Sequence, residues 1–200
     1  MYVKLDARQL KSIKKMHKAY LSLLIKSNGN MSIQNICLEA DVTRPTFYKF
    51  YKDPMELRLH LHETLLKDLK VCLEINHPKD MADFGPEELP ENMLWLFEHI
   101  LENQLAYEVL LVNQPDGLFI KTFKEILLQY IEDGIATTKI PPKDIRAERA
   151  FILHYVVGAY IESITWWIQN NCEHETSYMA LKLLELSLHG PYKVDIEWRK

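Results

Sequence analysis

Several side chains that can bind DNA lie close together in one short stretch of the sequence. Arg44 and Thr46 carry groups that hydrogen-bond to base edges, and Tyr48 and Lys49 carry groups that contact phosphates. Arg44 and Tyr48 are four residues apart, so in a helix they share one face. A basic, hydroxyl-rich face at the start of a helix is typical of a recognition helix in the DNA major groove.

Two short helices joined by a tight turn are expected to position this face. Ser32 can cap the first helix, and the turn follows at Asp41-Val42. Thr43 is a second N-cap, and Pro45 lies in the first turn of the next helix, where its missing N–H costs nothing. The apolar residues expected to face inward are Ile33, Ile36, Cys37, Ala40, Phe47 and Tyr51.

The spacing alone has a simpler explanation, because most helical hairpins are plain packing units. The stretch nevertheless resembles the helix-turn-helix of the tetracycline-repressor (TetR) family at a set of matching positions: Ser32, Ile33, Ile36, Cys37, Ala40, Asp41, Val42, Thr43, Thr46, Phe47, Tyr48 and Tyr51. The match extends through Leu57 and covers about a quarter of the chain. The resemblance implies a dimeric regulator that usually represses until a small molecule loosens it from a palindromic operator.

Three positions depart from the family pattern. Asp41 replaces the turn glycine, at a position expected to need a left-handed conformation, which Asp tolerates better than most residues. Pro45 replaces a small, flexible residue beside the expected base edges, so the target sequence should differ from those of better-known relatives. Pro54 replaces a lysine that relatives place near a DNA phosphate, a role that Lys52 can take.

The charge distribution also favours DNA binding. Residues 1–53 carry 10 Lys/Arg and 4 Asp/Glu, whereas the rest of the chain carries 14 and 24, and the whole chain has a net charge of −4. Because DNA attracts cations through its phosphates, a basic N-terminal part on an acidic body indicates nucleic-acid binding. The residues expected to contact a double-stranded DNA operator are Ser32, Thr43, Arg44, Pro45, Thr46, Tyr48, Lys49 and Lys52.

Composition and periodicity predict an all-α protein. The 200 residues are 48% hydrophobic and 26% charged, include only six glycines, and show many stretches with a helical period. We expect a three-helix DNA-binding domain with the helix-turn-helix over residues 1–53, a linking helix over about 54–76, and a helical domain for ligand binding and dimerisation over 77–200. Leucines at every fourth position from Leu57 to Leu69 make the linking helix either a lever or a structural strut.

The C-terminal part should be a bundle of apolar helices, over Glu91–Asn103, Leu105–Val112, Leu118–Ile131, Ile145–Ile168 and about Glu175–Leu188. The last two resemble the pair through which the family forms homodimers. Aromatic residues at helical spacing either line a pocket for an apolar or aromatic effector or simply fill a core. The candidate ligand-binding residues are Trp95, Phe97, His99, Tyr107, Phe119, Phe123, Tyr155 and Tyr160.

Other functional classes have little support. The eight histidines are dispersed, and His60-x-His62 places its rings on different helix faces, so neither a metal nor a cofactor is expected. Zinc-protease, phosphate-loop and nucleophile-elbow motifs are missing from the sequence, which argues against an enzyme. Three distant cysteines, a charged N-terminus and no apolar run near ~18 residues predict a cytoplasmic protein without a membrane segment. The alternative is a helical interaction or ligand-carrying protein whose DNA-binding domain is degenerate.

Overall fold

The computed structural model describes residues 6–26, 31–74, 88–137 and 147–191, and each regular element within these ranges is a helix. The expected all-α class is therefore confirmed. The chain divides into two compact units. Unit 1 comprises residues 1–68 and 103–122, and unit 2 comprises residues 69–102 and 123–200.

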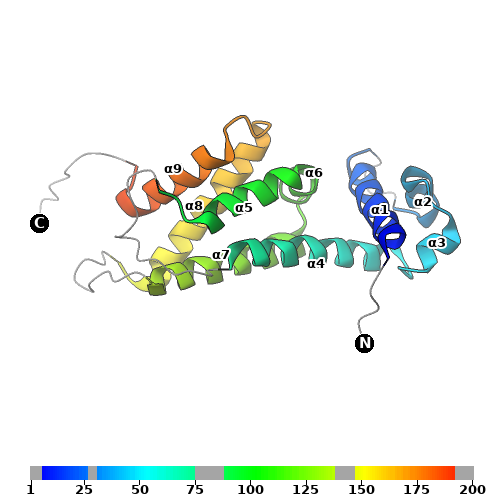
Figure 1. Cartoon of the computed structure of the whole chain (residues 1–200), viewed down its shortest axis with the longest axis horizontal. Helices are drawn as coiled ribbons and strands as arrows, with labels where there is room; N and C mark the ends of the chain where they lie inside the picture. Colours follow the sequence, from blue (N-terminus) through cyan, green and yellow to red (C-terminus); the bar gives the residue numbers. More distant parts are fainter. Residues whose placement is uncertain (1–5, 27–30, 75–87, 138–146, 192–200) are drawn as a thin grey trace, which may run out of the picture. The chain divides into compact units, whose positions relative to one another are not determined.

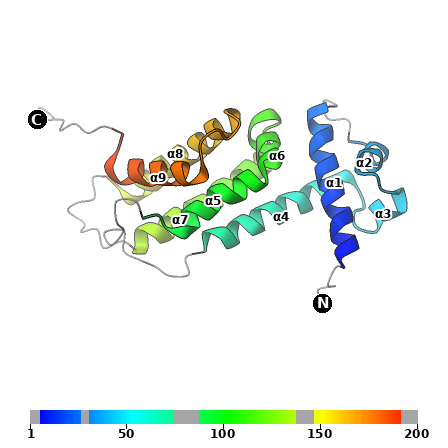
Figure 2. The same cartoon turned by 45° about the horizontal axis from the view of Figure 1, so that its top comes forward.

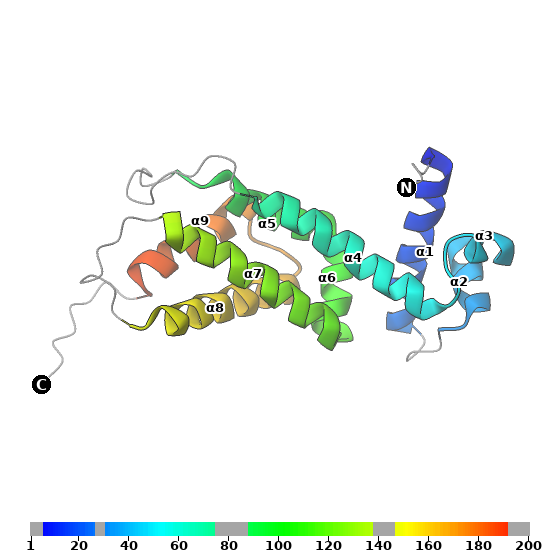
Figure 3. The same cartoon turned by 90° about the horizontal axis from the view of Figure 1, so that it is seen from below.

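Unit 1 contains the helix-turn-helix. Its elements are α1 (Ala7–Lys26), α2 (Ile33–Ala40), α3 (Arg44–Tyr48), the first part of α4 (Pro54–Leu73), α6 (Gln104–Tyr107), the π-helix η2 (Glu108–Asn113) and the start of α7 (Gly117–Thr137). α1 packs along α2, and α2 leads through a short turn to α3 (Figure 1). Figure 3 shows the same hairpin from below. Met16, Ile36 and Phe47 are fully buried and form its core.

Local hydrogen bonds cap the N-termini of both helices of the hairpin, as the sequence predicts. Ser32 Oγ accepts a hydrogen bond from the Asn35 amide at 3.1 Å, and Thr43 Oγ1 accepts one from the Thr46 amide at 3.3 Å. Asp41 follows α2 with φ 51° and ψ 54°, so the expected left-handed conformation is confirmed. These bonds join residues only three apart, so the hairpin geometry follows from its own sequence.

Side chains cap the start of α4 in a manner that resembles a capping box. Asp53 Oδ1 accepts a hydrogen bond from the Glu56 amide at 2.8 Å, and Glu56 Oε2 accepts one from the Lys52 amide at 2.7 Å. The leucine seam of α4 is buried, as predicted. The helix runs to Leu73, and its expected end near residue 76 lies outside the described residues.

Unit 2 is a helical bundle of α5 (Glu91–Glu102), the remainder of α7, α8 (Arg149–Gln169) and α9 (Thr176–His189). α9 packs along α5 and also contacts α8 (Figure 2). In the core, Phe97 and Trp167 meet edge to face with ring centroids 5.4 Å apart. The Trp167 indole donates a hydrogen bond to the His174 carbonyl at 2.9 Å, which ties the α8–α9 turn to the core.

After α5, two helices differ from the prediction. The helix expected over Leu105–Val112 is α6 followed by η2, because a π-turn allows Val109, Leu110 and Leu111 to be buried consecutively. α7 continues through Gly134 to Thr137, since no proline follows Ile131 within it and its charged residues lie on the exposed side. α8 begins at Arg149, and the expected start at Ile145 lies outside the described residues.

α8 is long and apolar enough to cross a membrane, by length and composition alone. The prediction of no membrane-length segment rested on continuous apolar runs, and polar residues interrupt those of α8. Core helices of globular domains pass the same test, and Val157, Ile164 and Trp167 of α8 are buried within unit 2. Packing inside the unit therefore accounts for part of the apolar character of α8.

Candidate nucleic-acid interface

α3 has one aromatic face turned inward and one polar face turned outward. Phe47 and Tyr51 are buried, with ring centroids 5.8 Å apart. Arg44 and Tyr48 are exposed. The two faces lie as the spacing predicts, and the buried aromatic side chains fix the direction in which Arg44 and Tyr48 point.

The hydroxyl groups at the start of α3 bond to each other. Thr43 Oγ1 and Thr46 Oγ1 lie 2.9 Å apart, in addition to the capping bond. A hydroxyl offers one donor and two acceptor sites, so Thr46 keeps capacity for a base edge. Ser32 and Thr43 act as helix caps in the structure, and DNA contacts by either residue stay a prediction.

The other residues expected at DNA surround the same face. Pro45 is exposed in the first turn of α3. Lys49 follows α3, and its Nζ lies 5.6 Å from the centroid of the Phe50 ring, a cation–π distance. Lys52 is exposed just before α4, where its amide is held by Glu56. The hairpin thus brings the predicted residues from Arg44 to Lys52 to one part of unit 1.

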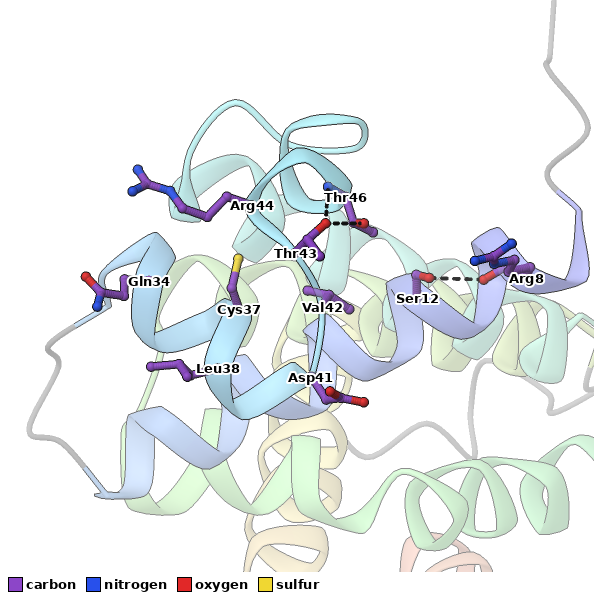
Figure 4. Close-up of a pocket in the computed structure, with 10 residues that line it drawn as sticks. All are labelled: Arg8, Ser12, Gln34, Cys37, Leu38, Asp41, Val42, Thr43, Arg44 and Thr46. Atoms are coloured by element: carbon purple, nitrogen blue, oxygen red, sulfur yellow. Dashed lines mark hydrogen bonds between the residues drawn. The ribbon is translucent and has the colours of Figure 1, made fainter.

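A groove of about 620 Å³ opens between α1, α2 and α3 (Figure 4). Its lining residues are Arg8, Ser12, Gln34, Cys37, Leu38, Asp41, Val42, Thr43, Arg44 and Thr46. In Figure 4, Gln34 and Leu38 of α2 project to the same side as Arg44 of α3. The sequence prediction missed Arg8, Ser12, Gln34 and Leu38, although the spacing of Gln34 and Leu38 was visible as an outward face of α2.

Ion pairs tie α1 to α2 beside this groove. Lys15 Nζ lies 3.0 Å from Asp41, and Lys26 Nζ lies 2.8 Å from Glu39. The hydrogen bonds from Lys26 and Ser22 hold the pKa of Glu39 below its usual value. Within the described residues before α4, the basic side chains that make no ion pair remain to meet phosphates: Arg8, Lys11, Lys14, Lys18, Arg44, Lys49 and Lys52.

A buried polar cluster supports the hairpin from behind. His17 Nε2 of α1 lies 3.1 Å from the Tyr51 hydroxyl, which lies 2.7 Å from His60 Nδ1 of α4. The Tyr51 hydroxyl can donate to one of these imidazole nitrogens while it accepts from the other, in either direction. Burial, and then the nearby charge of His60, lowers the pKa of His17 to about 4, and burial raises the pKa of Tyr51. His17 and Tyr51 are therefore both neutral at pH 7.

A second cluster joins α4 to the start of α7 inside unit 1. Arg58 forms an ion pair with Asp116, and His62 lies beside the same carboxylate. Burial lowers the pKa of His62, against an opposite effect of Asp116, so this histidine is neutral at pH 7. Among the described residues, no group of three His, Cys, Asp or Glu side chains could hold a metal ion.

The candidate ligand-binding residues are spread over both units. Six of them are buried, namely Phe97, His99, Tyr107, Phe119, Phe123 and Tyr160. Tyr107 and Phe119 belong to unit 1, with ring centroids 5.7 Å apart, and the other buried residues belong to unit 2. Trp95 and Tyr155 are exposed. A ligand-binding role for this set stays a prediction.

Comparisons with solved structures place this arrangement among known folds. A transcriptional regulator of the TetR type from Streptococcus agalactiae is 22% identical, with a TM-score of 0.60, and the match covers 90% of this chain and 95% of that chain. A TetR-family regulator from Syntrophomonas wolfei is 20% identical, with a TM-score of 0.65 and coverage of 93% and 99%. FadR from Bacillus subtilis, in complex with stearoyl-CoA, is 14% identical, with a TM-score of 0.62 and coverage of 90% and 99%.

The sequence itself matches a known family. No curated protein matches the chain significantly. A TetR-type family model, described as a transcriptional regulator C-terminal region, matches residues 87–189, just over half of the chain. Members of this family are transcription factors and not enzymes. The family model, the shared fold and the helix-turn-helix residues agree, and the chain belongs to the TetR family of transcriptional regulators.

Proposed function

We propose that this protein binds a palindromic DNA operator as a homodimer and represses transcription until a small apolar or aromatic effector releases it. The observation that carries the proposal is the outward face of α3. Arg44 and Tyr48 are exposed there, Thr46 keeps free hydrogen-bonding capacity, and Arg8, Lys49 and Lys52 make no ion pair within the described residues. Guanidinium and hydroxyl groups read base edges, and uncompensated cations bind phosphates.

The proposed dimer interface is an exposed stripe on α8 and α9. Phe151, Tyr155, Gly158, Ala159 and Trp166 recur at helical spacing on the exposed side of α8. A Cβ added at Gly158 would meet nothing within 4 Å in the protomer, so a second helix has room to approach closely. Exposed apolar residues continue onto α9, at Tyr178, Leu186 and Leu188. A monomeric protein rarely leaves such a surface uncovered, and a palindromic operator requires a second copy.

The proposed effector is apolar or aromatic because the interior of unit 2 is built from such residues. Phe97, Phe123, Tyr160 and Trp167 are all buried there. FadR from Bacillus subtilis, which has a similar fold, carries stearoyl-CoA, a ligand with a long acyl chain. This similarity supports an apolar ligand for a bundle of this kind.

Release from DNA requires that effector binding and DNA binding be coupled. An effector shifts DNA affinity only by its differential affinity for the DNA-bound and free states, and the coupling is reciprocal. α4 contributes residues to both units, and its first turns carry His60 of the cluster behind the hairpin. We therefore assign the coupling to α4.

The experiment that tests the proposal is selection of binding sites from random double-stranded DNA by the full chain. The expected result is an enriched sequence with two inverted half-sites whose centres lie about one helical turn apart. Arg44→Ala, carried through the same selection, should lose the enrichment at specific positions. A pool without sequence preference would overturn the proposal, and an enriched single half-site would overturn its dimeric form.

A further inference from the structure

Leu38 is the most exposed large apolar side chain in the described part of the chain, at 73% of its accessible surface. Gln34 precedes it by four residues and is also exposed, so both lie on one face of α2. The buried residues of α2, at Ile36, Cys37 and Ala40, belong to other faces. Stability of the hairpin therefore gives no reason for a leucine at this position.

The Gln34–Leu38 face is continuous with the proposed DNA-reading face. Both residues line the groove together with Arg44 and Thr46, and in Figure 4 they project to the same side as Arg44. Basic side chains without ion pairs, including Arg8 of the same groove, lie on the helices around it. A glutamine amide can donate a hydrogen bond to a phosphate, but an apolar side chain has no donor, so a contact with the DNA backbone does not account for Leu38.

The chemistry of the pair matches one kind of base pair. A glutamine amide hydrogen-bonds in a bidentate way to N6 and N7 of adenine, and an apolar side chain contacts the 5-methyl group of thymine. Both groups are presented in the major groove by an A·T pair, and thymine alone carries the methyl group. Resting on the function proposed above, we propose that Gln34 and Leu38 of α2 read A·T base pairs beside those read by α3, with Leu38 against a thymine methyl group.

The test uses the full chain and the DNA sequence that it selects. Each thymine of that site is replaced in turn by deoxyuridine, which lacks only the methyl group, and each adenine by 7-deazaadenine, which lacks N7. For the wild-type protein, one or two thymine replacements should weaken binding about fourfold, the factor that corresponds to one buried methyl group. Leu38→Ala should bind the unmodified site more weakly by a similar factor and should no longer respond to deoxyuridine at those positions. Gln34→Ala should lose its response to 7-deazaadenine in the same way.

Two controls separate this inference from simpler effects. Leu101→Ala removes an equivalent side chain, 43% exposed, from unit 2 and should change neither affinity nor the deoxyuridine response. Thermal unfolding of Leu38→Ala should match the wild type, because the side chain is exposed. The inference would be overturned if Leu38→Ala kept the full deoxyuridine response, or if it weakened binding to all DNA equally. The proposed function would still stand in that case, provided that the sequence preference depended on Arg44. Loss of all sequence preference in the wild-type protein would overturn both.

Discussion

Arg58 of α4 binds a single oxygen of Asp116, with Nε at 2.7 Å and Nη2 at 2.5 Å from Oδ2. The other oxygen, Oδ1, accepts hydrogen bonds from the amides of Leu118 and Phe119 at 3.0 and 3.1 Å and so caps α7. His62 Nε2 lies 3.5 Å from Oδ2 and makes no hydrogen bond within the described residues. Burial alone would raise the pKa of Asp116, but the Phe119 amide, His62 and Arg58 together lower it.

Two substitutions at Asp116 should separate the ion pair from the helix cap. Asp116→Asn keeps a capping oxygen but loses the charge that faces Arg58, so the free energy of unfolding should fall by about 1–3 kcal/mol. Asp116→Ala loses the cap as well, which should cost about 1 kcal/mol more. Urea unfolding at neutral pH measures both values. Equal losses for the two variants would mean that Oδ1 contributes nothing to α7.

Acid should destabilise the protein through His17. Its pKa is about 4 in the folded chain and 6.5 when unperturbed, so between these values the unfolded chain binds a proton that the folded chain does not. The free energy of unfolding is therefore unaffected by this group above pH 6.5 and falls as the pH drops toward 4, by about 3 kcal/mol at most. His17→Gln, which can still bond to Tyr51, should flatten the slope in this window. An unchanged slope would assign the acid sensitivity to other groups.

A single charge on the exposed stripe of α8 should prevent dimer formation. Phe151→Glu places a carboxylate at a position that is 66% exposed in the protomer, and in a symmetric interface both copies carry it. The dimer dissociation constant should rise about tenfold or more, since an unpaired buried charge is costly. The matched control is Val71→Glu on α4, which is 57% exposed and should leave association unchanged. Sedimentation of the two variants decides whether α8 forms the interface.

The effector proposal predicts a reciprocal effect. Titration with hydrophobic compounds, such as long-chain acyl thioesters, should change tryptophan emission, because Trp167 lies in the core of unit 2. Operator DNA should weaken ligand binding by the same factor by which the ligand weakens DNA binding. Compounds that bind without any effect on DNA affinity would support a ligand pocket but would contradict the proposed coupling through α4. Failure of all apolar compounds to bind would favour a filled aromatic core.

The hairpin could be predicted from the sequence because its determinants are local. The caps at Ser32 and Thr43 and the left-handed turn at Asp41 act over three or four residues. The supporting clusters could not be predicted in this way, since His17 and Tyr51 are 34 positions apart and Arg58 and Asp116 are 58 apart. No spacing rule connects such residues before the helices are packed.

Aromatic residues set a different limit to sequence reasoning. Tyr155 and Tyr160 lie on the same helix, yet the first is exposed and the second is buried. α8 is apolar around most of its circumference, so its sequence does not show which side faces the core of the protomer. Packing against α9 and the rest of unit 2 decides this, and a pocket residue cannot be told from a core residue until it does.

The most direct test of whether the outward face of α3 reads DNA is the ratio of operator affinity to random-DNA affinity. It is measured over a range of salt concentrations for the wild type, Arg44→Ala and Lys49→Ala. The wild-type ratio should be on the order of 10³ or more. Arg44→Ala should lower the ratio by roughly tenfold or more, because a base contact contributes about 1–3 kcal/mol. Lys49→Ala should weaken binding to both DNAs equally and reduce the salt slope by about one. An unchanged ratio for Arg44→Ala would contradict the assignment of α3 as the helix that reads DNA.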